Sequence, residues 1–159
     1  MKCGPALLCM VLFFASFAST TSFAKEIGEY REEAAQYYLE QNYKKAYKIY
    51  YKLAKMGDHP SQDQVAVMLA RGEGKDIDFE NAYAWSVLAA EGGDDILTIQ
   101  SEELLQQADD KAKAEKQASR LMKKYGRDAL LEKAEAQEMR RLSRQMGGCT
   151  GSKRGCSGP

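Results

Sequence analysis

The sequence predicts an all-α protein: a short right-handed α-solenoid of about two helix-turn-helix repeats, followed by C-terminal capping helices. The first observation is an internal repeat, because residues 42–58 and residues 78–94 share one layout without a gap, at an offset of 36 residues. The second is that apolar residues recur at three- and four-residue steps, the spacing of a helix face. A repeat of this length is typical of stacked helix pairs, none of which can bury its apolar face alone.

Residues 1–24 are expected to be a cleaved signal peptide. Lys2 gives a positive start, residues 6–18 are almost wholly apolar, and Ser22-Phe23-Ala24 has the small-x-small pattern of a cleavage site. A membrane anchor is the disfavoured alternative, since about 13 apolar residues fall short of the ~20 needed to cross a bilayer. The mature protein would begin at Lys25 and be exported, and the expected compartment is a bacterial periplasm.

Charge is distributed unevenly along the mature chain. Residues 25–110 contain 9 basic and 18 acidic residues, a net charge of −9, whereas residues 111–159 contain 13 basic and 5 acidic residues, a net charge of +8. Two interpretations remain open. Either the basic part folds back on the acidic part or meets an anionic partner, or the two parts are solvated helix faces of opposite bias.

Two cysteines remain after cleavage, Cys149 and Cys156, in a tail of residues 147–159 that is too rich in glycine and serine to pack. In an oxidising compartment we expect them to form one small disulfide-closed loop. Zinc binding is disfavoured, because two thiolates supply only half of a four-ligand site. The sequence predicts neither a cofactor nor a metal site.

The first helical hairpin is expected in residues 26–56. Residues 26–41 carry one apolar stripe, formed by Ile27, Tyr30, Ala34, Tyr37 and Tyr38. Asn42 is expected to end this helix, because asparagine tolerates the left-handed conformation, and to cap the next one with its side chain. Residues 43–56 place aromatic and small residues on one side and five lysines on the other, and Gly57 ends the helix.

The second hairpin is expected to follow directly. Pro60 suits the first turn of a helix, so the third helix is predicted to begin near Ser61 and to end at Arg71. A glycine loop at residues 72–74 leads to Asp78, which is expected to cap a fourth helix that stops at Gly92-Gly93.

The pattern in these two helices is specific. The run from Val65 to Gly74 reads VAVMLARGEG, and it is followed by Asp78, Ala82, Trp85, Ala89-Ala90 and Gly93. This pattern resembles a Sel-1-like repeat, a relative of the tetratricopeptide repeat, and residues 43–58 resemble the second half of a preceding degenerate repeat. The sequence departs from the family pattern at Ala66, Leu69 and Lys75, where the family usually has glycine, tyrosine and valine. Over residues 30–94 the resemblance implies an α-solenoid and an interaction role, without catalytic residues.

Residues 95–146 are expected to form charged, alanine-rich capping helices. Residues 95–125 are either one unbroken helix or two, and the break is favoured, with Asp109 or Asp110 as the cap, because a solenoid end needs a closing hairpin with a polar outer face. The second helix would point Ala112, Ala118, Leu121, Met122 and Tyr125 inward. Asp128 is expected to cap a last helix with a narrow stripe of Leu131, Met139, Leu142 and Met146.

The sequence argues against three apparent catalytic or ligand sites. His59 is expected in a solvent-exposed turn, with no cysteine or serine at a catalytic spacing. The glycines of residues 72–74 lack the Gly-Lys-Ser/Thr that a phosphate loop requires. A calcium loop that began at Asp76 would need a glycine where Asn81 stands.

The candidates for partner binding are one tyrosine and three arginines. Most tyrosines in residues 30–83 are expected in the core, but Tyr51 follows Tyr50 on a helix and cannot share its inward direction. The outer face of the last helix carries Arg140, Arg141 and Arg144. Export and a balanced overall charge argue against nucleic acid as their partner.

These observations predict an exported, non-enzymatic module that binds a protein or peptide. Contact with a membrane surface is compatible with the sequence, but a membrane span is not expected. One alternative is a β-lactam-binding or β-lactam-hydrolysing enzyme of the cysteine-rich Sel-1-like type, although residues 25–148 lack the cysteine pairs of that type. The other is a structural protein attached to an anionic envelope surface through its basic last helix.

Overall fold

The computed structural model describes residues 25–146, and every regular element in that range is an α-helix, which confirms the all-α prediction. A helical stretch at residues 25–39 comes first. The later helices are α2 (Tyr43–Ala54), α3 (His59–Arg71), α4 (Phe79–Ala90), α5 (Asp95–Gln107), α6 (Lys111–Tyr125) and α7 (Arg127–Met146). The predicted signal peptide and the predicted Cys149–Cys156 disulfide lie outside the described residues.

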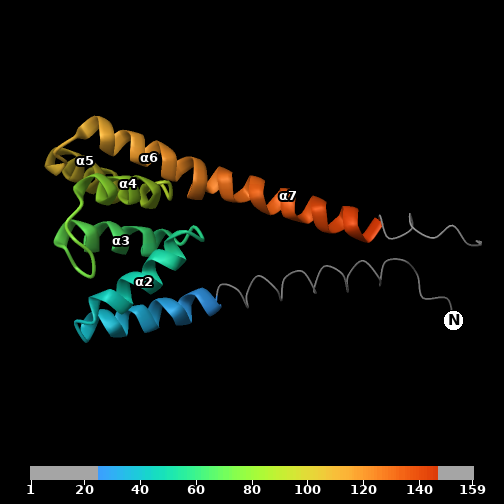
Figure 1. Cartoon of the computed structure of the whole chain (residues 1–159), viewed down its shortest axis with the longest axis horizontal. Helices are drawn as coiled ribbons and strands as arrows, with labels where there is room; N and C mark the ends of the chain where they lie inside the picture. Colours follow the sequence, from blue (N-terminus) through green and yellow to red (C-terminus); the bar gives the residue numbers. More distant parts are fainter. Residues whose placement is uncertain (1–24, 147–159) are drawn as a thin grey trace, which may run out of the picture.

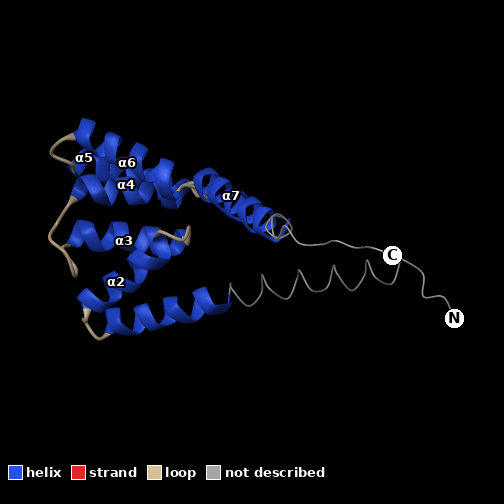
Figure 2. Ribbon diagram, turned by 45° about the vertical axis from the view of Figure 1, so that its right-hand side comes forward, coloured by secondary structure: helices blue, strands red, loops and turns tan. Residues whose placement is uncertain are grey.

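The helices are stacked in chain order. Figure 1 shows the stack from residues 25–39 through α2, α3 and α4 to α5 and α6. Helix α4 is central, since it packs against α3, α5 and α6, whereas α2 packs against α3. Helix α7 has its main contact with α6 and extends away from the stack (Figure 2). None of the helices described combines the length and apolarity that a bilayer span requires.

The 36-residue offset of the sequence repeat is also the offset between helix ends. Helix α2 runs from Tyr43 to Ala54 and α4 from Phe79 to Ala90, and the bounds of α3 and α5 differ by the same 36 residues. The offset of helix ends therefore extends to Gln107, although the residue pattern of the repeat stops at Asp94. The outer face of α5 is exposed, so packing does not require the residue pattern to continue there.

The turns repeat as well. Gly57 and Gly93 occupy equivalent positions and both are left-handed, with φ of 89° and 83°. The aspartate after each glycine accepts a hydrogen bond from a backbone N–H in the first turn of the next helix, Asp58 for α3 and Asp94 for α5. A glycine that reverses the chain and an aspartate that caps the next helix thus define each junction between the hairpins.

The predicted caps at Asp78 and Asp110 are confirmed, because their carboxylates accept hydrogen bonds from Asn81 N–H and Lys113 N–H. The break before α6 is confirmed with them. Helix α3 begins at His59, two residues before the predicted start, since Asp58 provides the cap and leaves Pro60 in the first turn, where no N–H is needed.

Two predicted caps are wrong. Gln41, with φ of 58°, takes the left-handed conformation expected of Asn42, and Asn42 precedes α2 without a side-chain cap hydrogen bond. Asp128 lies inside the first turn of α7, because the first backbone hydrogen bond there runs from Leu130 N–H to the Gly126 carbonyl. The Asp128 carboxylate is still favourable near the positive end of the helix dipole.

The core extends from residues 25–39 to α6. Small residues lie where helices approach closely, including the equivalent Ala46 and Ala82, both fully buried. The larger buried residues of the main cluster are Tyr50, Val65, Met68, Leu69, Trp85, Leu88 and Leu104. On α6 the prediction for Ala112 is wrong, since it is exposed and Ala114 is buried instead. Ala114 and Ala118 are four residues apart and share one face, which Ala112 does not.

Candidate functional site

Four aromatic rings form a continuous row across α2, α4 and α6, which we call the aromatic row. Tyr47 and Tyr51 of α2 stack with centroids 5.6 Å apart. Tyr51 meets the edge of Trp85 of α4 at 5.5 Å, and Trp85 stacks on Tyr125 of α6 at 5.8 Å. Ring pairs at these distances add stabilisation beyond their buried area, so the row ties three separate helices together.

The row borders a hollow of about 350 Å³, which we call the groove. Its wall is formed by three rings of the row, Tyr47, Tyr51 and Trp85, together with Leu69 of α3 and Leu121 of α6. The opposite rim is the α3–α4 loop and the start of α4, which contribute Lys75, Asp76, Ile77, Asp78 and Asn81. A concave site with an aromatic wall and a few polar groups on its rim is the usual form of a ligand site.

The groove is lined by aromatic rings on one side and by charged groups on the other. Burial raises the pKa of Tyr47 to about 12, and the nearby Tyr51 and Asp78 act in the same direction. Asp78 is occupied as a cap, because its carboxylate accepts hydrogen bonds from the backbone and side-chain nitrogens of Asn81. Lys75 and Asp76 are the exposed charged groups of the rim, and neither they nor Asp78 makes an ion pair with another described residue.

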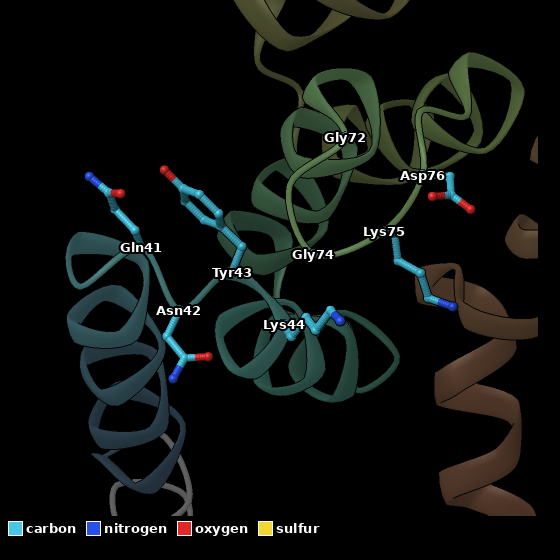
Figure 3. A pocket seen from close by; sticks show the side chains of 8 residues that line it. All are labelled: Gln41, Asn42, Tyr43, Lys44, Gly72, Gly74, Lys75 and Asp76. Carbon is cyan, nitrogen blue, oxygen red and sulfur yellow. The ribbon is translucent and has the colours of Figure 1, made fainter.

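A second hollow, of about 440 Å³, lies on the other side of the same loop. Figure 3 shows the loop passing over the start of α2, with Gly74 next to Tyr43. A Cβ on Gly74 would lie 2.5 Å from the Tyr43 carbonyl oxygen, so only glycine permits this approach. Its other lining residues are Gln41, Asn42, Lys44, Gly72, Lys75 and Asp76, and it lacks the aromatic wall of the groove.

The loop is anchored to the first helix by a tyrosine. Tyr38 donates a hydrogen bond from its hydroxyl to the Glu73 carboxylate at 2.8 Å, and Arg71 donates to the same hydroxyl at 3.4 Å. The hydrogen bond to Glu73 raises the pKa of Tyr38, since it favours the protonated hydroxyl. These contacts fix the position of the loop relative to the helical stretch at residues 25–39.

The structure places the four predicted binding residues in two separate regions. Tyr51 is half-buried within the aromatic row, where it contacts Trp85 and forms part of the groove wall. Arg140, Arg141 and Arg144 are exposed on α7, beside a shallow hollow that they share with Gln137 and Gln145. The two regions belong to different surfaces and do not form one site.

Sequence reasoning missed several groove residues. Trp85 was identified only as part of the repeat pattern, and it is only 2% exposed, yet it also lies in the groove wall. Tyr47 and Asp76 were not selected as binding residues. The sequence feature that could have identified Tyr47 is its four-residue spacing from Tyr51, which places both rings on one helix face.

His59 differs from its expected place in a solvent-exposed turn. It is half-buried in the first turn of α3, and its Nδ1 lies 3.0 Å from Gln62 Oε1 and 3.2 Å from the Leu88 carbonyl oxygen. These contacts link α3 to α4 and give the imidazole a structural role. Within residues 25–146, no group of three histidine, cysteine or acidic side chains is placed to hold a metal ion.

Comparisons with known proteins give no relative for this chain. No protein-family model matches the sequence, and neither a curated protein nor a solved structure is similar enough to count as a match.

Proposed function

We propose that this protein is an exported, non-enzymatic interaction module that binds a peptide segment of a partner protein in the groove. The observation that carries this proposal is the aromatic row, which lines a hollow of about 350 Å³ across helices of successive repeats. Tyrosine and tryptophan are enriched among the residues that dominate binding energy at protein interfaces, because they bury large area at low entropic cost. The proposed residues are Tyr47, Tyr51 and Trp85, with Asp76 on the rim.

The groove's chemistry indicates what such a peptide carries. An apolar or aromatic side chain would pack on the ring of Tyr51 and beside Leu121. A lysine or arginine next to it would face the Asp76 carboxylate, which has no ion-pair partner within 4.0 Å among the described residues. The acidic bias of residues 25–110 would attract a basic segment over a longer range.

We also propose that the chain is a divergent Sel-1-like repeat protein, and that its hairpins form a short α-solenoid. Support comes from the shared 36-residue offset of helix ends and from the equivalent glycine and aspartate junctions. An experimental structure with the helix-pair rotation of an unrelated α-fold would contradict this assignment.

Peptide selection from a random displayed library tests the binding proposal. Enriched peptides are expected to combine an aromatic or aliphatic residue with lysine or arginine. Trp85 is the sole tryptophan of the chain, so its fluorescence reports directly on occupation of the groove. A selected peptide that binds without changing this fluorescence would contradict the location of the site.

A charge reversal separates the groove from general electrostatics. Asp76→Lys is expected to weaken the selected peptide about tenfold, because a like charge then faces its basic residue. Asp109→Lys is the matched control, since Asp109 is also exposed and lies in the α5–α6 loop, outside the groove lining. Equal losses in both variants would refute specific recognition at Asp76.

Helix α7 supports a second candidate function, attachment to an anionic envelope surface. Leu131, Met139 and Leu142 are exposed on it, and Arg140, Arg141 and Arg144 extend into solvent beyond the stack. Such a helix can insert apolar side chains while its cations contact anionic lipid headgroups. Sedimentation with vesicles of anionic lipid tests this, and R140E/R141E/R144E should abolish it; unchanged sedimentation of that variant would refute it.

A further inference from the structure

Helices α2 and α5 lie on opposite sides of α3 and α4 in the stack and carry opposite charge. The five lysines of the α2 region, Lys44, Lys45, Lys48, Lys52 and Lys55, lie within about 100° on one face of the helix, which we call the lysine face. Residues 43–55 contain no acidic residue, and residues 91–110, which include α5, contain no basic residue. Figures 1 and 2 agree that α2 and α5 lie toward opposite ends of the stack.

The lysine face of α2 is exposed, although the equivalent face of α4 is buried. Lys48 and Lys52 are exposed, and a shift of 36 residues places them at Ala84 and Leu88 of α4, which are both 0% exposed. Helix α4 is covered because α3, α5 and α6 all pack against it, whereas α2 packs mainly against residues 25–39 and α3 and meets α4 through Tyr51 and Trp85. The first repeat thus presents to solvent a helix face that the second repeat buries.

The outer face of α5 is uncovered in the same way at the other end. It carries Ile96 and Ile99, which are 74% and 58% exposed, beside the exposed carboxylates of Asp95, Glu102 and Glu103. We call these five residues the acidic face. Two isoleucines this exposed on one helix face indicate a contact surface, because a helix face that only meets solvent would need no large apolar residues.

The two faces are complementary in both charge and apolar surface. The lysine face adjoins tyrosine rings, since Lys45 Nζ lies 4.8 Å from the Tyr37 ring and Lys52 Nζ lies 5.3 Å from the Tyr30 ring. The ring of Tyr30 is 41% exposed and, with the aliphatic stems of the lysines, offers apolar surface to the two isoleucines. The ion pairs found in residues 25–146 involve other side chains, so the charges of both faces remain available.

We propose that the lysine face binds the acidic face of a second copy of this chain, so that copies associate head to tail. The two faces lie toward opposite ends of one molecule, and one copy cannot satisfy both within itself. Such a contact joins unlike surfaces, and it therefore propagates into a chain or ring of copies instead of stopping at a symmetric dimer. One helix face against another is a small interface, so the association is weak and dependent on salt.

Sedimentation of the purified protein over a range of concentrations tests this proposal. The average mass is expected to rise with concentration at about 0.05 M salt and to return to that of the monomer at about 1 M, where the Debye length falls to roughly 3 Å. A protein that remains monomeric at low salt and at the highest soluble concentration overturns the proposal.

Paired charge reversals identify the surfaces. K44E/K48E alters only the lysine face and E102K/E103K only the acidic face, and each is expected to lower the association constant about tenfold or more. None of these four side chains takes part in an ion pair within residues 25–146. K116E/K123E, at two exposed lysines of α6, is the matched control and should associate as the unaltered protein does.

Mixing the two variants gives the decisive result. The K44E/K48E protein retains its acidic face and the E102K/E103K protein retains its lysine face, so the mixture is expected to associate through these two unaltered faces. This outcome also shows that both variants are folded. Association of either variant alone at the level of the unaltered protein, or loss of association in the K116E/K123E control, overturns the assignment. This contact uses neither the groove nor α7, and its test is independent of the proposed functions.

Discussion

The contact between Gly74 and the start of α2 yields a prediction whose magnitude the structure defines. Gly74 is left-handed, with φ of 82°, and a Cβ there would lie 2.5 Å from the Tyr43 carbonyl oxygen, 2.8 Å from its carbon and 3.1 Å from Tyr47 Cβ. The first two atoms belong to the backbone of α2 and cannot rotate away. Gly74→Ala therefore requires the loop to move from the helix.

Gly93 is the matched control for this substitution. Its φ of 83° is nearly the same, but a Cβ there would meet nothing within 4 Å. Gly93→Ala should cost about 1–2 kcal/mol, the penalty of a left-handed alanine. Gly74→Ala should cost about 2–5 kcal/mol, because displacement of packed backbone adds about 1–3 kcal/mol to the same penalty.

Urea denaturation followed by the circular dichroism of the helices measures both values. The slope of the free energy against urea should be the same for the two variants, so that the midpoint difference reports stability alone. Gly74→Ala should also weaken the selected peptide, since it moves Lys75 and Asp76 on the groove rim. Equal destabilisation by the two substitutions would show that the approach to Tyr43 contributes nothing.

Three further predictions concern single residues. Gln41→Gly should raise the free energy of unfolding by about 1 kcal/mol, because Gln41 has a φ of 58° and glycine adopts that conformation without strain; a loss of stability in urea would contradict this. Burial raises the pKa of Asp63 above its usual 3.8, so the folded state binds the proton more tightly than the unfolded state does. The contribution of Asp63 to stability is therefore greatest below pH 3.8 and falls as the pH rises through the raised pKa. Asp63→Asn removes the charge and retains an oxygen for the Gln100 hydrogen bond, so it should stabilise the protein more at pH 7 than at pH 3. An equal effect at both pH values would refute the burial argument. The pKa of Tyr47 is raised from 10.0 to about 12, so protonated Tyr47 favours the folded state below pH 10 and this contribution is lost as the pH rises to about 12. The Tyr47→Phe variant should therefore unfold at a higher pH than the unaltered protein. It should also lack the last phenol to titrate in the ultraviolet spectrum.

The sequence determined the helical class and most of the chain's turns. Local signals were sufficient there: Asp78 and Asp110 cap the helices that follow them, and glycines end helices at Gly57 and Gly93, because these effects involve neighbours within one turn. At Asn42 the local rule failed by one residue, since Gln41 took the left-handed position instead. The choice between adjacent residues depends on how the two helices pack, which propensity does not describe.

The binding groove was only partly accessible from the sequence. Tyr51 was selected because it could not share the inward direction of Tyr50, but the structure shows it against Trp85, 34 positions further along the chain. Contacts of this range depend on the crossing of α2 and α4, and Tyr125 joins the row only because α6 returns to α4 after α5. The helix periodicity of each segment cannot specify those crossings.

The same division explains the exposed lysine face of α2. The sequence showed five lysines on one side of a helix, but not whether a later helix covers that side. Only the tertiary structure decided that Lys48 and Lys52 remain exposed where Ala84 and Leu88 are buried. Helix formation is encoded in neighbours three and four residues apart, whereas exposure of a helix face depends on which later helix returns to cover it.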